Sequence, residues 1–269
     1  MKPKPSKFQY VGAIVCGIPS SLPDAAQRLS DPSEAVNYNK AVQQHQEYVR
    51  ALKDLGLQVI ELPADEKYPD CVFVEDVAVV CDKVALLARL GHTTRRGEAT
   101  KMKTTLQQLG LKVVEMQEPA ALDGGDVLFT GKEFLVGLST RTNLAGVNYL
   151  AETFPSYPVT TIPVTEHLHL KSMMTMAGDD MIVVGESEEA KNAWSEMEKK
   201  ARFRYEKLSV SEDTAANCVF VNGTLLHLSA AEIPNSIETF NKITGPKIEL
   251  ENSELHKVDG CLTCLSILI

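Results

Sequence analysis

The chain has 269 residues, of which 44% are hydrophobic and 23% charged, and a formal net charge of −9. This length and balance are typical of a globular protein with a substantial core, and the negative charge argues against nucleic acid or an anionic membrane as the main partner. No apolar run is long enough to cross a membrane, and the polar, proline-containing residues 1–5 do not form a signal peptide. We expect one domain over residues 1–269.

Six cysteines, at positions 16, 71, 81, 218, 261 and 264, do not have the spacing that is typical of a disulfide framework. The first four lie in or beside apolar runs, so buried thiols are expected there. Cysteines used in this way favour a reducing, cytoplasmic compartment.

The predicted elements alternate between helices and pairs of strands. A first helix is predicted to begin at residues 31–34, where Asp31 can cap the helix and Pro32 and Glu34 fit its first turn. Apolar side chains at helical spacing follow as far as Leu52. Further helices are predicted near residues 97–109, 143–153, 187–200 and 235–243, and hairpins over 72–88, 126–138, 173–185 and 218–228. In the last hairpin, Asn222-Gly223 is typical of a type I′ turn.

An internal repeat organises these elements. The segments GLQVIEL (56–62) and GLKVVEM (110–116) match closely, and GPKIEL (245–250) is a weaker copy. Each follows a predicted helix and begins with a glycine suited to end it. The pattern predicts an α/β fold in which a ββαβ-like unit occurs about five times, and strands from both ends of the chain complete one unit. Such repeats favour a closed radial array.

Chemically active residues mark equivalent places in different units. Asp70–Asp76, Asp123–Asp126, His169 and Cys264 each lie where a loop enters a strand. In a radial array these places converge on the axis, so we expect the residues to line one central cavity.

The residue types fit nucleophilic catalysis. A cysteine attacks as its thiolate and needs a base or a lowered pKa. His169 can protonate a leaving amine and then activate water, and Asp123 is the best candidate for orienting its imidazole. The carboxylates of Asp70, Glu75 and Asp76 suit a guanidinium. Separately, Arg95, Arg96 and Arg141 could bind a substrate carboxylate.

Other interpretations remain open. Cys264 could be a buried core thiol, and His169 could be a core histidine whose hydrogen bonds are satisfied within the protein. Cys261-x-x-Cys264 could be a redox pair or half a zinc site. Residues 261–269 are predicted to form a strand, which would point the two thiols to opposite faces and disfavour such a pair. Gly124-Gly125 could mark only a tight turn.

Five longer segments resemble the dimethylarginine dimethylaminohydrolase family, in particular its animal type-1 form. They are PDCVFVEDVAVV (69–80), LDGGDVLFTG (122–131), GLSTRTN (137–143), LHLKS (168–172) and VDGCLTC (258–264). The resemblance extends from about Val11 to Ile269. It implies the pentein fold, a five-bladed α/β propeller with a central active-site cavity, which agrees with the repeat.

The resemblance also implies an activity, the hydrolysis of Nω-methylated L-arginines to citrulline and methylamine or dimethylamine, which relieves inhibition of nitric oxide synthase. It implies Cys264 as the nucleophile, His169 as the acid and base, and Asp123 as its support. Substrate contacts are implied at Leu29, Asp70, Glu75, Asp76, Arg95, Arg141 and the Val258 backbone. No cofactor is required, no nucleic acid or membrane partner is implied, and a monomer is expected.

The sequence departs from the family pattern at three places. The lid leucine fits Leu29 only with a shift of one residue. Cys261 replaces an apolar residue, and Leu265 replaces a second cysteine. Because Cys264 and His169 are competent zinc ligands once the thiol is deprotonated, inhibitory zinc binding is expected there. Rival functions are an arginine or agmatine deiminase of the same superfamily and a catalytically silent pentein with a regulatory binding role.

Overall fold

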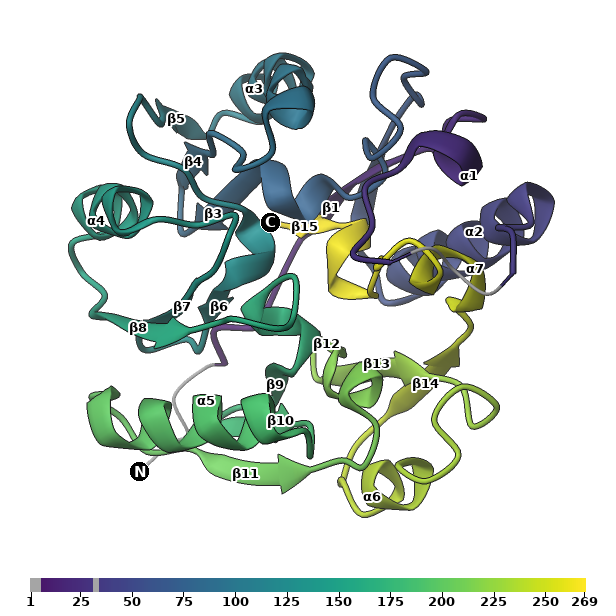
Figure 1. Cartoon of the computed structure of the whole chain (residues 1–269), viewed down its shortest axis with the longest axis vertical. Coiled ribbons are helices and arrows are strands. Elements are labelled where there is room, and N and C mark those ends of the chain that lie inside the picture. Colours follow the sequence, from purple (N-terminus) through teal and green to yellow (C-terminus); the bar gives the residue numbers. More distant parts are fainter. Residues whose placement is uncertain (1–5, 31–33) are drawn as a thin grey trace.

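Five three-stranded sheets are arranged around a central axis in the computed structural model, which describes residues 6–30 and 34–269 (Figure 1). In each sheet the middle strand pairs antiparallel with one neighbour and parallel with the other. Four sheets are built from consecutive strands: β3 (Ala78–Cys81), β4 (Val84–Leu87) and β5 (Lys112–Glu115); β6 (Val127–Phe129), β7 (Phe134–Leu138) and β8 (Val159–Pro163); β9 (Met174–Gly178), β10 (Met181–Val184) and β11 (Glu206–Ser209); β12 (Val219–Val221), β13 (Thr224–Leu228) and β14 (Lys247–Leu250).

The fifth sheet joins the two ends of the described chain. Its strands are β1 (Gly12–Cys16), β2 (Gln58–Leu62) and β15 (Ile267–Leu268). Strand β15 runs antiparallel to β1, with Ala13 opposite Leu268, and β1 runs parallel to β2. The prediction that both ends complete one ββαβ unit is therefore confirmed, and the array is a closed ring.

One helix connects the second and third strands of each unit and lies on the outside of the ring (Figure 1). These helices are α2 (Tyr38–Asp54), α3 (Ala99–Gln108), α4 (Leu144–Thr153), α5 (Glu188–Lys200) and α6 (Ile237–Asn241), and the short helices α1 (Leu22–Ala25) and α7 (Ser253–His256) lie in connections. Helix α2 begins later than predicted, because the Asn37 side chain accepts from the Lys40 amide at 3.1 Å and caps it there. The predicted cap at residues 31–33 lies outside the described residues.

The predicted turns have the expected backbone. Gly56, Gly110 and Gly245 have φ of 86°, 75° and 112° after the helices that precede them. Asn222 and Gly223, with φ of 50° and 80°, join β12 to β13 as a type I′ turn.

Among the described residues, no helix combines the length and apolar character needed to span a membrane.

Short 3₁₀ turns precede the first strand of every unit, and two of them lie where longer strands were predicted, over residues 72–80 and 261–269. They cover Val74–Val77, Gly124–Asp126, Leu170–Ser172, Asp213–Ala216 and Thr263–Leu265. In the turn Val74–Val77, the Glu75 carboxylate accepts from Thr263 and the adjacent Asp76 carboxylate accepts from Arg95. A strand would instead point these two side chains to opposite faces of a sheet. The predicted extension of strands into residues 72–77 and 261–266 is therefore wrong.

Candidate active site

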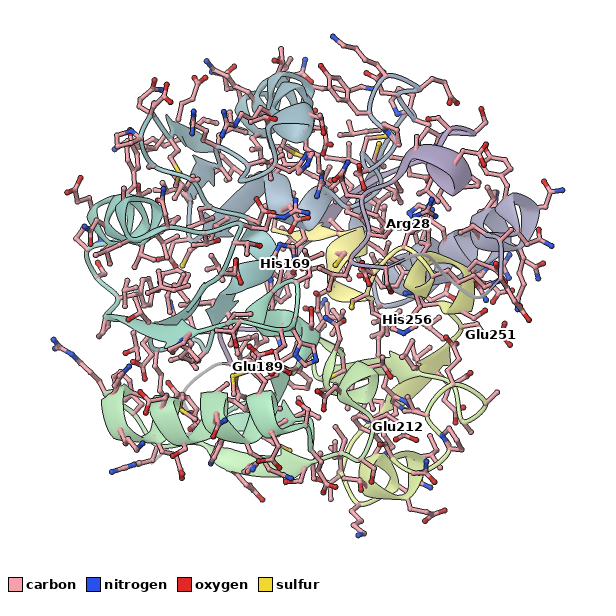
Figure 2. The ribbon with its side chains drawn as sticks, in the orientation of Figure 1. Arg28, His169, Glu189, Glu212, Glu251 and His256 are labelled. Carbon is pink, nitrogen blue, oxygen red and sulfur yellow. The ribbon has the colours of Figure 1, made fainter. Side chains whose placement is uncertain are left out.

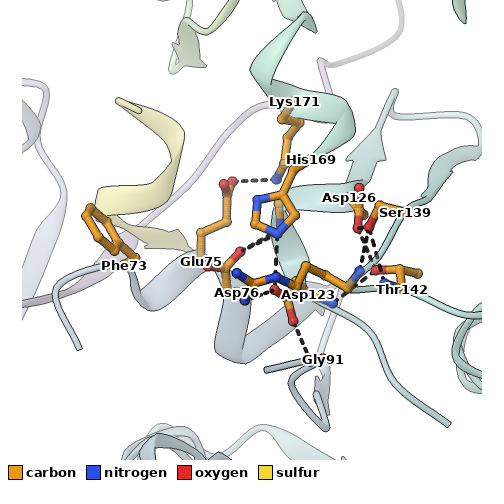
Figure 3. Close-up of polar contacts among 12 residues, drawn as sticks. Phe73, Glu75, Asp76, Gly91, Asp123, Asp126, Ser139, Thr142, His169 and Lys171 are labelled. Carbon is orange, nitrogen blue, oxygen red and sulfur yellow. Dashed lines mark hydrogen bonds and ion pairs between the residues drawn. The ribbon is translucent and has the colours of Figure 1, made fainter. Parts of the chain in front are cut away.

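Three of these turns bring a histidine and two carboxylates together, and the histidine, His169, lies near the centre of the ring (Figure 2). His169 Nε2 lies 3.1 Å from Asp123 Oδ2 and 3.9 Å from Asp76 Oδ1 (Figure 3). All three side chains are buried. The structure thus brings together three of the residues that the sequence placed in different units.

The carboxylates determine the charge of His169. Burial alone would lower the pKa of the imidazole, but Asp76, the hydrogen bond with Asp123 and the nearby Asp126 outweigh it and raise the pKa to about 9. His169 is therefore an imidazolium at neutral pH, the form that can protonate a leaving amine.

Gly124 and Gly125 allow the Glu75 backbone and the His169 ring to lie very close to the chain at these positions. A Cβ on Gly125 would lie 2.5 Å from His169 Nδ1, and one on Gly124 would lie 2.0 Å from the Glu75 carbonyl oxygen. Both side chains would overlap the site. The Gly124-Gly125 pair is thus required for packing around the imidazole, beyond marking a turn.

Asp126 holds the backbone that follows His169. Its carboxylate accepts hydrogen bonds from Ser139 Oγ and Thr142 Oγ1, each at 2.6 Å, and from the Leu170 amide at 3.0 Å (Figure 3). No role of its own was predicted for Asp126 from the sequence. Its position beside Asp123 in the LDGGD segment was the available signal.

Arg95 lies in an internal ion-pair network. Its Nη1 is 2.7 Å from Asp76 Oδ2, and its Nε and Nη2 each lie 3.0 Å from a Glu98 oxygen. Burial raises the pKa of Glu98 to about 6 despite this arginine. The network fixes Asp76 beside His169. A contact between Arg95 and a substrate carboxylate stays a prediction.

Arg141 is less tightly paired than Arg95. Its Nη1 lies 3.9 Å from Asp123 Oδ2, and its side chain is 14% exposed. The guanidinium therefore lies beside the His169–Asp123 pair and retains access to solvent, where an incoming anion could reach it.

A ring of four polar residues connects the His169 turn with the Cys264 turn. The Glu75 carboxylate pairs with Lys171 Nζ and accepts from Thr263 Oγ1 at 2.7 Å (Figure 3 shows the Glu75–Lys171 part). Asn217 Nδ2 donates to the Lys171 carbonyl at 2.9 Å and to Thr263 Oγ1 at 3.0 Å, and Asn217 Oδ1 accepts from the Thr263 amide at 3.0 Å. Lys171, Asn217 and Thr263 were not predicted from the sequence.

Cys264 is buried in the turn that precedes β15. Its amide donates to the Cys261 carbonyl at 3.2 Å, so residues 261–264 form a turn rather than the predicted strand. The Cys261 thiol, burial and the carboxylates of Glu75 and Asp76 raise the pKa of Cys264 well above its usual value. The surroundings of Cys264 therefore favour the neutral thiol.

The segment before α2 is anchored near the same site. The Gln27 amide donates to Asp70 Oδ1 at 2.9 Å, and the Leu29 amide donates to Asp259 Oδ2 at 2.6 Å. The Leu29 side chain is 60% exposed, whereas Val258 is buried. Both stay predictions as substrate contacts.

His167 and Glu189 support the loop before His169 (Figure 2 labels Glu189). His167 lies 2.7 Å from Glu189 Oε2 and 3.0 Å from Asp213 Oδ2. The Glu189 carboxylate also accepts from the Thr165, Glu166 and His167 amides. These contacts are structural and bind the loop to helix α5.

Within the described residues, Asp76, Asp123 and His169 form a group whose donor atoms lie within 4.8 Å of one another and could hold a metal ion. The proton on His169 and the Arg95–Asp76 ion pair oppose such binding at neutral pH, because metal ligands must be deprotonated. The expected inhibitory zinc site at Cys264 and His169 stays a prediction.

Five ββαβ units around a buried His169–Asp123 pair define the pentein class of α/β propellers. The profile of the eukaryotic N,N-dimethylarginine dimethylhydrolase family matches residues 19–217, and the chain belongs to that family. It is 36% identical to "Putative hydrolase DDAH2" of Bos taurus, over 96% of this chain and 93% of that one. It is 34% identical to the N(G),N(G)-dimethylarginine dimethylaminohydrolase of Streptomyces coelicolor, over 87% and 88%.

A solved structure supports the same fold. The dimethylarginine dimethylaminohydrolase of Pseudomonas aeruginosa, as a cysteine-to-serine mutant complexed with citrulline, superposes with a TM-score of 0.85. The match is 26% identical and covers 97% of this chain and all of the other. The predicted pentein fold and family are confirmed.

Proposed function

We propose that this chain hydrolyses Nω-methylated L-arginines, both asymmetric dimethylarginine and monomethylarginine, to citrulline and dimethylamine or methylamine. The observation that carries the proposal is the buried His169–Asp123 pair, with Asp76 beside it, in a family named for this reaction. A protonated imidazole beside carboxylates suits a reaction in which a cation binds and an amine leaves.

The proposed nucleophile is Cys264. Its neutral thiol becomes a better acid when a cationic guanidinium enters, because the cation offsets the carboxylates that raise its pKa. The thiol proton passes to solvent as the cation binds, the thiolate attacks the guanidinium carbon, and a neutral tetrahedral adduct forms. His169 then gives its proton to the departing amine, and a thiouronium remains on the sulfur.

The second half of the reaction uses the same imidazole. His169 is now neutral and takes a proton from water, which attacks the thiouronium carbon. The C–S bond breaks, the proton of the new hydroxyl group passes to the leaving sulfur, citrulline leaves and Cys264 returns as the neutral thiol. Asp123 holds the imidazole throughout and stabilises its charge. The scheme needs no metal or organic cofactor.

The proposed substrate contacts divide by charge. Asp70, Glu75 and Asp76 face the guanidinium or the α-amino group, and Arg141 and Arg95 bind the α-carboxylate. Arg141 is the stronger candidate, because Arg95 is already paired with Glu98 and Asp76. Leu29 and the Val258 backbone complete the pocket. In the cell, we propose, a cytoplasmic monomer removes methylated arginines and so relieves inhibition of nitric oxide synthase.

Product analysis tests the proposal. The purified chain should release citrulline and dimethylamine in equal amounts from asymmetric dimethylarginine, and Cys264→Ser should abolish turnover without loss of fold. The matched variant Cys261→Ser should keep most activity. Ammonia release from arginine would indicate a deiminase instead, and a folded chain that turns over neither substrate would indicate a silent binding protein.

A further inference from the structure

A second thiol lies on the same turn as Cys264. The Cys264 amide donates to the Cys261 carbonyl at 3.2 Å, and the 3₁₀ turn Thr263–Leu265 follows directly. Residues at i and i+3 of such a turn lie on one face, with Cα atoms within about 7 Å. Disulfides bridge Cα atoms roughly 4.4–6.8 Å apart, so the backbone here suits a bond between the two sulfurs.

The side chains use this geometry. The Cys261 side chain raises the pKa of Cys264, and it is the largest influence on that thiol. Cys261 also packs against the hydrophobic cluster that contains Cys264. The turn therefore holds the two side chains on one face, contrary to the separation that a strand would give.

Exposure distinguishes this pair from the other cysteines. All six cysteines lie in the described part of the chain, and Cys261 is the one that is not buried. Cys16 and Cys71 also interact through their side chains, but both are buried. Cys81 and Cys218 are also buried, and neither lies on a turn that carries a second cysteine.

We propose that Cys261 is an oxidation site that forms a reversible disulfide with Cys264 when the protein meets a hydroperoxide. The peroxide O–O bond breaks as it takes two electrons from the Cys261 sulfur, which becomes a sulfenic acid. The Cys264 sulfur then attacks the Cys261 sulfur, and the hydroxyl group leaves with a proton as water. Two thiols have become one disulfide, and the peroxide has been reduced.

The consequence for activity rests on the proposed function, whereas the disulfide does not. A sulfur bound to Cys261 cannot attack a guanidinium, so oxidation switches the enzyme off. A thiol reductant restores both cysteines. Cys261 thereby protects the nucleophile from oxidation to a sulfinic acid, which thiols do not reverse.

The test treats the reduced, metal-free protein with hydrogen peroxide, alkylates the remaining free thiols and maps the peptides. We expect a peptide with an internal Cys261–Cys264 link, a matching loss of activity, and recovery of both with dithiothreitol. Cys261→Ser, and Cys261→Ala if the first variant folds poorly, should lose the recoverable component. Cys81→Ala removes a buried cysteine at the end of another strand, β3, and should behave as the unaltered chain.

Two results would overturn the proposal. One is a peptide map in which the only link joins Cys16 to Cys71. The other is recoverable inactivation of the same extent in Cys261→Ser. A Cys261–Cys264 link with unchanged activity would support the oxidation site and contradict Cys264 as the nucleophile, so the two proposals fail separately.

Discussion

His169 Nε2 and Asp123 Oδ2 lie 3.1 Å apart, and both side chains are almost completely buried. The pair joins residues 46 positions apart in the sequence. Asp76 and this pair together raise the pKa of the imidazole in a place where burial alone would lower it. In the proposed mechanism, proton transfer to the leaving amine depends on this relationship.

The pH dependence of activity should report the pair. Since His169 must carry a proton when the amine leaves, kcat/KM should fall as the pH rises through about 9. Asp123→Asn removes the charge that holds the proton, so this alkaline limb should move to lower pH. A pH profile of both proteins checks this, with the exposed Asp180→Asn as the control. An unmoved limb in Asp123→Asn would contradict the role of the carboxylate.

Stability should follow the same proton. The pKa of His169 in the folded state, about 9, lies above its ordinary 6.5. The protonated group therefore contributes stability that is fully present below about pH 6.5 and is lost as the pH rises to about 9. The shift corresponds to roughly 3 kcal/mol. Urea unfolding across this range should show the loss in the original chain and a smaller loss in His169→Gln; equal losses would contradict the account.

Arg141 should determine recognition of the substrate carboxylate. Arg141→Ala should weaken binding of a substrate with an α-carboxylate by about 2–5 kcal/mol, the range for breaking a buried charged pair. A decarboxylated analogue should be affected far less. Steady-state kinetics with both compounds measures the difference, and Arg204→Ala on the outer surface is the control. Equal losses for the two compounds would make Arg141 a structural residue.

Asn217 should act as a positioning residue, because it binds both the Lys171 backbone and Thr263. Asn217→Ala should cost about 1–3 kcal/mol of stability, since buried groups lose partners. It should also lower kcat more than it raises KM. The control Asn222→Ala removes hydrogen bonds to Tyr10 and should cost stability without changing kcat at a temperature where both variants are folded. Identical kinetics in the two variants would leave Asn217 a purely structural role.

Zinc should inhibit rather than activate. Full activity is expected after exhaustive chelation, with loss on stepwise addition of zinc. Because zinc must displace the protons of His169 and Cys264, inhibition should weaken as the pH is lowered. Activity assays at several pH values check this. Activity that disappears with the chelator and returns with zinc would contradict thiol catalysis.

The ring was predictable from the sequence because its signals are local. Gly56 and Gly110 end helices before matching strands, and Asn222-Gly223 determines a hairpin. The convergence of Asp76, Asp123 and His169 followed from their equivalent places in the repeat. None of these inferences needs long-range contacts.

The finer structure of the site depends on distant partners. Residues 261–266 are apolar enough to resemble a strand, but Thr263 bonds to Asn217 and Glu75, far away in the sequence, and the segment turns. Glu98 likewise binds the Arg95 guanidinium, although no local feature of the sequence distinguishes it from an ordinary glutamate at the start of a helix. Pairings over such distances leave no periodic signal.

The most direct test of the account is to trap the covalent intermediate. The enzyme is mixed with asymmetric dimethylarginine, quenched with acid during turnover and analysed by peptide mass spectrometry. We predict a substrate-derived thiouronium on Cys264 that disappears as citrulline accumulates, and no adduct in Cys264→Ser. Turnover with no adduct on Cys264, together with undiminished activity in Cys264→Ser, would contradict the proposed mechanism.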